Sequence, residues 1–261
     1  MRAAEKRFSD IAMPLGGLGL LQDAIIQLAG IQRKPVPIIR PRAAVIFCAD
    51  NGVVAEGVTQ CGQNVTASVT RNMGQGRSTM CMMAKSIDMN VFPVDIGVAE
   101  KFSFKGVVDK KIRKGTENIA ENAATTRDEA IAAVKTGIEL AENCAQQGFR
   151  LVCGGEMGIG NTTTSAAVTA ALTGAPASRV TGRGAGLSSE GLHKKMQVVE
   201  KSLAINRPNP DDPVDVISKV GGLDIAGLSG VFIGGALAHV PVVVDGVISA
   251  VAALAAEGMI P

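Results

Sequence analysis

Four continuous apolar runs are spaced along the chain, and each has the length of a strand. A strand that is covered on both faces needs apolar residues throughout, so these runs predict buried strands at residues 43–49, 91–96, 151–153 and 240–244. Between the runs, the patterns predict helices at residues 64–73, 78–86, 126–148, 164–172, 189–206 and 248–256, and another from residue 221. The basic stretch 106–113 is compatible with an edge strand. Strands that alternate with helices predict an α/β fold with a Rossmann-like, doubly wound and mainly parallel sheet.

The beginning of the chain does not follow this alternation. Residues 18–28 carry a helical apolar face that stops at Gly30. Three prolines between residues 35 and 41 then mark an extended linker. We therefore expect a small helical appendage at residues 1–35 and one α/β nucleotide-binding domain at residues 36–261.

Composition excludes several classes of function. The 261 residues are 46% hydrophobic, with a net charge of +2, seven Phe and no Trp or Tyr, which argues against a nucleic-acid-binding protein. The five cysteines are odd in number and none has CxxC spacing, so we expect reduced thiols and neither a disulfide framework nor a metal site. The last apolar stretch contains Asp245, and the first ten residues are charged. We therefore expect neither a membrane span nor a signal peptide, and a cytoplasmic protein.

A glycine-rich turn follows the run at residues 151–153. We expect Gly154, Gly155, Gly158 and Gly160 to form this turn and Asn161 or Thr162 to cap the helix after it. A strand, a glycine turn and a helix start together predict an anion site, because the backbone can approach closely and free N–H groups point at the ligand. A carboxylate would repel a phosphate there. Glu156 is therefore expected to face another part of the substrate, where it could accept a proton or a hydrogen bond, although it could also simply favour a helix start.

Other polar residues lie where strands end. Asp50, Asp95, Glu156 and Asp245 all end buried strands, and the carboxyl ends of parallel strands share one edge of a sheet. The alternative interpretation for the three aspartates is turn formation, since Asp before Gly is ordinary turn chemistry.

Several further residues are open to two interpretations. Arg183, between glycines, and Lys195, on a helix, could each bind phosphate or be solvated charges. Thr59 and Gln63 could line a pocket for an aromatic base or belong to a polar loop. We expect neither histidine to be catalytic, and we expect the methionines at residues 80–83 to be core.

Six strings of residues occur in the order of a known family. They are Ala49-Asp-Asn-Gly-Val-Val-Ala-Glu-Gly-Val58, Val94-Asp-Ile-Gly97, Gly155-Glu-Met-Gly-Ile-Gly-Asn-Thr-Thr163, Gly182-Arg-Gly-Ala-Gly186, Val220-Gly-Gly-Leu-Asp-Ile-Ala226 and Val242-Val-Val-Asp-Gly-Val-Ile-Ser249. With these strings the chain resembles the nicotinate-nucleotide:dimethylbenzimidazole phosphoribosyltransferases, which activate the lower ligand of cobalamin. The third string is highly specific.

The resemblance implies a transfer of 5-phosphoribose from nicotinate mononucleotide to an aromatic base. Nicotinate leaves, the anomeric carbon inverts, and the product is an α-riboside 5′-phosphate; no cofactor and no metal is implied. Glu156 matches a carboxylate at the base-binding site and is the candidate catalytic residue. The candidate substrate-binding residues are Asp50, Thr59, Gln63, Asp95, Met157, Gly158, Gly160, Asn161, Thr162, Thr163, Arg183, Gly184, Gly186, Lys195, Asp224, Asp245 and Ser249.

The chain departs from the family pattern in three places. The family continues beyond the position of Pro261 with a segment whose glutamate is taken as the catalytic base. Its Asp-His-Gly is here Asp50-Asn51-Gly52, and its Pro-Gly-Ser-Leu-Gly is here Leu15-Gly-Gly-Leu-Gly19. A relative works as two different subunits and also activates phenols. We therefore expect a homodimer, or a heterodimer with a homologous subunit, and weak or no activity of the chain alone. The alternatives are a non-catalytic subunit and, more distantly, a nucleotide sensor.

Overall fold

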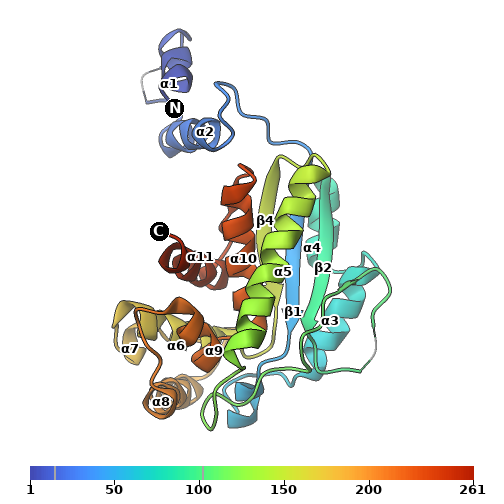
Figure 1. The fold of residues 1–261 in the computed structure, drawn as a ribbon, viewed down its shortest axis with the longest axis vertical. Coiled ribbons are helices and arrows are strands. Elements are labelled where there is room, and N and C mark those ends of the chain that lie inside the picture. Colours follow the sequence, from blue (N-terminus) through green and yellow to red (C-terminus); the bar gives the residue numbers. More distant parts are fainter. Residues whose placement is uncertain (15, 102) are drawn as a thin grey trace.

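The computed structural model describes residues 1–14, 16–101 and 103–261, and its centre is a parallel sheet (Figure 1). The sheet has five strands in the order β3-β2-β1-β4-β5. The strands are β1 (Arg42–Ala49), β2 (Met89–Gly97), β3 (Val108–Asp109), β4 (Leu151–Met157) and β5 (Val242–Val243). The predicted α/β fold with a Rossmann-like parallel sheet is confirmed. The basic stretch contributes β3, which is an edge strand.

Helices lie on both faces of this sheet and beyond its two ends (Figure 1). They are α1 (Arg2–Ser9), α2 (Leu20–Ile31), α3 (Asn64–Gly74), α4 (Thr79–Ser86), α5 (Arg127–Gln146), α6 (Asn161–Thr173), α7 (Ala177–Val180), α8 (Ser189–Asn206), α9 (Pro213–Val220), α10 (Leu223–Leu237) and α11 (Val247–Met259), with a 3-10 turn η1 (Gly52–Glu56). Helices α5 and α10 cover one face, and α3 and α4 lie on the other (Figure 1). Thr126 and Glu129 form a capping box at the start of α5.

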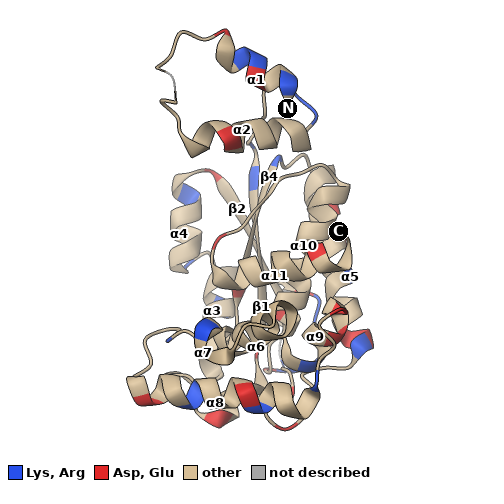
Figure 2. Ribbon diagram, turned by 90° about the vertical axis from the view of Figure 1, so that its left-hand side faces the viewer, with Lys and Arg blue, Asp and Glu red and all other residues tan. Residues whose placement is uncertain are grey.

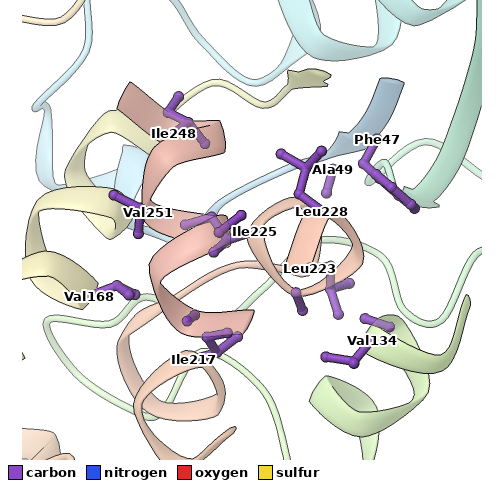
Figure 3. Close-up of a cluster of buried hydrophobic side chains, with 14 of the residues drawn as sticks. Phe47, Ala49, Val134, Val168, Ile217, Leu223, Ile225, Leu228, Ile248 and Val251 are labelled. Carbon is purple, nitrogen blue, oxygen red and sulfur yellow. The ribbon is translucent and has the colours of Figure 1, made fainter. Parts of the chain in front are cut away.

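The alternation of side chains along β1 divides the core into two layers. Phe47 points toward α10 and joins the larger apolar cluster with Leu223 and Ile225 (Figure 3). Ile46 belongs to the smaller cluster on the other face, which includes Met73 of α3. Because both faces of β1 are covered by helices, its continuous apolar run is the pattern of a central parallel strand.

Charged residues are rare in the helix that packs on the sheet and common in a helix farther from it. Helix α10 is almost entirely buried and carries a single charged residue, Asp224, whereas α8 carries acidic and basic residues along its length (Figure 2). In the described residues, no helix is long and apolar enough to cross a membrane.

Helices α5 and α10 pack with their backbones in contact. A Cβ atom added at Gly230 of α10 would lie on the carbonyl oxygen of Val134 and 2.9 Å from the Cα atom of Gly137 in α5. Glycine at these positions lets the two backbones approach more closely than any side chain would allow. This contact fixes α10 against α5, and α10 itself packs on β1 and β4.

Replacing Gly230 with Ala is expected to lower the free energy of unfolding by about 1–3 kcal/mol or more, because the added methyl group has no space between two backbones. Urea denaturation followed by circular dichroism measures the loss. The matched control is Gly182→Ala, where a Cβ atom would meet nothing within 4 Å. Equal stability of the Gly230 variant and the control would show that the helix contact tolerates a wider spacing.

The first two helices form a unit with its own small apolar cluster. Ala4, Ile26 and Ala29 are buried together, and Phe8 packs against them. Gln32, after α2, donates a hydrogen bond from Nε2 to the carbonyl oxygen of Arg150, at 3.1 Å, next to β4. The division at residue 35 remains a prediction, and Leu15, in the altered N-terminal pattern, lies outside the described residues.

Candidate active site

The glycine-rich turn is shorter than the sequence pattern indicates. Gly154 and Gly155 belong to β4, where a Cβ atom at Gly155 would lie 2.5 Å from the Cδ1 atom of Ile46. Only residues 158–160 form the turn, and Gly160 adopts a left-handed conformation with φ 98°. Helix α6 then begins at Asn161.

The predicted cap of α6 was wrong. The N-cap residue is Gly160, and no side chain caps the helix. Asn161 lies in the first turn, and its Nδ2 atom donates to Glu156 and, at 3.0 Å, to Asp224. Thr162 points to another element and accepts a hydrogen bond from Lys195. No side chain caps this helix start, where the amides of Asn161 and Thr163 donate to the carbonyl oxygens of Gly158 and Gly160, at 3.1 and 2.9 Å.

A first hollow lies at this helix start and has a cavity volume of about 130 Å³. Its walls come from the segment after η1, the turn before α6, the second glycine loop and α8. They are Val58, Thr59, Gln60, Cys61, Gly158, Ile159, Gly160, Asn161, Thr162, Arg183, Gly184, Ala185, Leu187 and Lys195.

Lys195 is the charged group most deeply placed in the first hollow. Lys195 is only 1% exposed, and its Nζ atom donates a hydrogen bond to Thr162 Oγ1 at 2.7 Å. Among the described residues, no carboxylate forms an ion pair with it. Burial lowers the pKa of Lys195 to about 8. A buried ammonium group without a carboxylate partner is well suited to bind an anion.

The second glycine loop closes the first hollow from the side of α8. Gly184 has φ +56°, and a Cβ atom there would lie 3.0 Å from Thr162 Oγ1 and 3.4 Å from Lys195 Nζ. The guanidinium group of Arg183 donates hydrogen bonds to the Leu187 carbonyl oxygen, at 2.7 Å, and to Ser189 Oγ at the start of α8, at 3.1 Å. The loop glycine therefore allows the backbone to approach the lysine.

A second, larger hollow lies between the ends of β4 and β5 and helices α3 and α4, with a cavity volume of about 800 Å³. Five methionines line it together with other apolar residues: Met73, Met80, Met83, Met89 and Met157. Its charged lining residues are Arg77, Glu156 and Asp245. A mostly apolar hollow with a few convergent polar groups is the usual form of a site for an organic ligand.

Glu156 lines the second hollow and accepts a hydrogen bond from Asn161, which lines the first. Burial raises its pKa to about 7; the negative charges of Asp224 and Asp245 add to this effect, and the hydrogen bond from Asn161 opposes it. The carboxylate therefore changes its charge near neutral pH, where a general base is most effective. Asn161 joins the two hollows, because it lines the first and bonds to the acid in the second.

The strand-end carboxylates do not all meet in one place. Asp50 accepts from the Ala99 amide at 2.8 Å, while Asp95 accepts from the Val98 amide at 2.9 Å and pairs with Lys111 at 3.0 Å. Neither aspartate lines either of the two hollows. β2 and β4 flank β1 on opposite sides, so only the acids on the β4 side reach the second hollow.

Other candidate residues also lie outside the hollows. Gln63 donates to the Asn51 carbonyl oxygen at 3.2 Å, and the Gly186 carbonyl oxygen accepts from Gln60 at 2.6 Å. Ser249 accepts from the amides of residues 245 and 246, both at 2.9 Å, and so organises the start of α11. Thr163 and Asp224 are completely buried behind the turn.

The structure adds three residues that the sequence analysis did not select. Asn51 has both polar side-chain atoms buried without a hydrogen-bond partner among the described residues. Gln60 and Arg77 line the first and second hollow, respectively. Asn51 belongs to a string that resembles the family, which is a usable signal, whereas Gln60 and Arg77 carry none. No group of three or more His, Cys, Asp or Glu in the described chain could hold a metal ion.

Comparison with known proteins gives one consistent result. A family model described as Phosphoribosyltransferase matches residues 1–261. The nicotinate-nucleotide–dimethylbenzimidazole phosphoribosyltransferases of Acetivibrio thermocellus and Clostridium acetobutylicum are 48% and 44% identical to the chain, covering 100% of it and 74% of each relative. The crystal structure of CobT from Thermus thermophilus superposes with a TM-score of 0.95 at 37% identity, covering 100% of this chain and 78% of that one. The chain therefore belongs to the nicotinate-nucleotide–dimethylbenzimidazole phosphoribosyltransferase family and is a pentosyltransferase.

Proposed function

We propose that the chain transfers 5-phosphoribose from nicotinate mononucleotide to an aromatic lower-ligand base of the dimethylbenzimidazole or phenol type. The products are nicotinate and an α-riboside 5′-phosphate. One observation carries the proposal: a hollow at a helix start, lined by the buried Lys195, is joined through Asn161 to a carboxylate in an apolar hollow. The names of the relatives supply the identity of the donor and the acceptor.

The first hollow suits the phosphate of the nucleotide. The amides at the start of α6 and the positive end of the helix favour a negative group, and Lys195 adds a full positive charge. Gly158 and Gly160 carry no side chain, so a phosphate can approach the positive end of α6 and the ammonium group of Lys195 closely.

The second hollow suits the acceptor. Methionine side chains are apolar and polarizable, and they pack well against aromatic rings. The reaction forms a bond between the acceptor's nucleophilic atom and the anomeric carbon, and it breaks the bond from that carbon to the ring nitrogen of nicotinate. Nicotinate leaves with the electron pair of the broken bond. The acceptor's proton moves to a carboxylate, for which we propose Glu156.

Positioning accounts for much of the expected rate. The ring nitrogen of nicotinate is already cationic in the nucleotide and therefore leaves readily. Holding the acceptor in line with the anomeric carbon can contribute up to roughly 7–11 kcal/mol in ideal cases. A base with a pKa near 7 is substantially ionised at neutral pH and can remove the acceptor proton.

A second candidate function is a subunit that completes a homologous catalytic partner. The β5 edge of the sheet favours this second function. Val243 and Val244 are 40% and 47% exposed there, and Val243 also lines the second hollow. An exposed apolar edge strand is a natural place for another segment or chain to add. In this form the active assembly is a heterodimer, and in the first form a homodimer.

Titration calorimetry with nicotinate mononucleotide tests the proposal. We expect binding by the wild-type chain, and an absence of binding by folded protein would remove the donor assignment. Nicotinate release with dimethylbenzimidazole or phenol is then measured with the chain alone and with a homologous full-length subunit. Turnover by the chain alone supports the enzyme, whereas turnover only in the mixture supports the completing subunit.

A further inference from the structure

We propose that Asp224 is a positioning residue, which fixes the amide of Asn161 and through it the proton-accepting carboxylate of Glu156. It would act without touching substrate, since it lines neither hollow. This inference rests on the proposed role of Glu156. It adds a positioning role for Asp224, which is 0% exposed.

The amide of Asn161 is held between two carboxylates. Its Nδ2 atom donates to Glu156 Oε2 and, at 3.0 Å, to Asp224 Oδ2. An amide nitrogen has two hydrogens, so both are used. The opposite orientation would place the amide oxygen against two acceptors, which is unfavourable. The two carboxylates therefore select one orientation of the amide, and Asn161 also lines the first hollow.

Asp224 is built into the fold as a charged group. Its Oδ1 atom accepts from the Ile225 amide at 3.0 Å in the first turn of α10, where the helix dipole favours an acid. A Cβ atom at Gly158 would lie 2.6 Å from Asp224 Oδ2, and one at Gly222 would lie 2.5 Å from its Oδ1. Two glycines therefore leave room for this carboxylate. In the described part of the chain, Asp224 forms no ion pair. A buried acid without a cation partner is costly, which argues for a task beyond packing.

The charges around Glu156 come from three elements. Asp224 lies at the start of α10, Asp245 follows β5, and Arg77 lies between α3 and α4 in the wall of the same hollow. The two aspartates raise the pKa of Glu156, and the contribution of Asp224 is the larger. Burial also raises the pKa of Asp224, to about 6. The two acids titrate as a coupled pair, so removing the charge of one changes the titration of the other.

The test is Asp224→Asn, which keeps the shape and removes the charge. We expect kcat for nicotinate release to fall about 10–100-fold, because the amide of Asn161 is no longer held in one orientation. The acid limb of the pH profile should move to lower pH, since the larger of the two negative charges is gone. Asp215→Asn in the first turn of α9 is the matched control and should keep the wild-type rate and profile.

A double-mutant cycle separates positioning from general structure. If Asp224 acts through Asn161, Asp224→Asn should change kcat little in an Asn161→Ala background. Multiplying effects would overturn the proposal, as would a wild-type rate and profile in the single variant. Carbon-13 NMR titration of Glu156 adds a readout that needs no turnover: its midpoint should fall in Asp224→Asn, and an unchanged midpoint contradicts the coupling. A wild-type chain that does not bind nicotinate mononucleotide would instead remove the proposed function, while the titration still decides the coupling.

Discussion

Replacing Glu156 with Gln is expected to reduce nicotinate release by about 10²–10⁴-fold, the range typical for loss of a general base. Glutamine has nearly the same shape and can still bond to Asn161, but it cannot take up the acceptor's proton. The affinity for nicotinate mononucleotide should not change, because we place its phosphate in the other hollow. Initial rates and titration calorimetry on the same preparation separate the two quantities.

The pH dependence of this effect has a defined sign. The wild-type base must be ionised, so kcat/KM should rise as the pH increases through about 7, the pKa of Glu156. The Glu156→Gln variant should lack that rise. Glu190→Gln, at the exposed start of α8, is the matched control and should behave as wild type. A Glu156→Gln enzyme with the wild-type rate would place the base elsewhere.

Replacing Lys195 with Met is expected to weaken the binding of nicotinate mononucleotide by about 2–5 kcal/mol, as for truncation of one member of a buried charge pair. At about 1.4 kcal/mol per factor of ten, this corresponds to roughly 30-fold to several-thousand-fold in Kd. Methionine keeps most of the side-chain volume, so the hollow should retain its shape. Lys194→Met, on the same helix but exposed, is the control and should bind normally.

Two further binding experiments test whether Lys195 binds the phosphate group of the nucleotide. Nicotinate riboside, which lacks the phosphate, should bind equally to the wild-type chain and to Lys195→Met. The lysine binds as an ammonium group, so wild-type affinity for the nucleotide should fall as the pH rises through about 8, and Lys195→Met should not show this fall. An equal loss of affinity for the riboside would indicate that Lys195 supports the loop instead of the phosphate.

Local patterns predicted most of the secondary structure. The apolar run of β1 and the capping box of α5 both depend on neighbours within a few residues, so their structures follow from the chain itself. The turn between β4 and α6, where we place the candidate site, was also predictable, because a strand, glycines and a helix start occur together in one string. The cap of α6 was predicted wrongly, because the rule for capping counts spacing and does not register a partner 63 residues away, as Asp224 is from Asn161.

The sequence by itself therefore determined most of the elements, their parallel arrangement and the presence of a turn before α6, since backbone preference and apolar periodicity act over short distances. Only the tertiary structure decided which polar groups work together. The order of strands separates Asp95 from Glu156, and the packing of α10 on the sheet brings Asp224 to Asn161. The physical reason is that pKa values and hydrogen-bond partners depend on burial and on distances of a few ångströms, which arise only when distant segments pack.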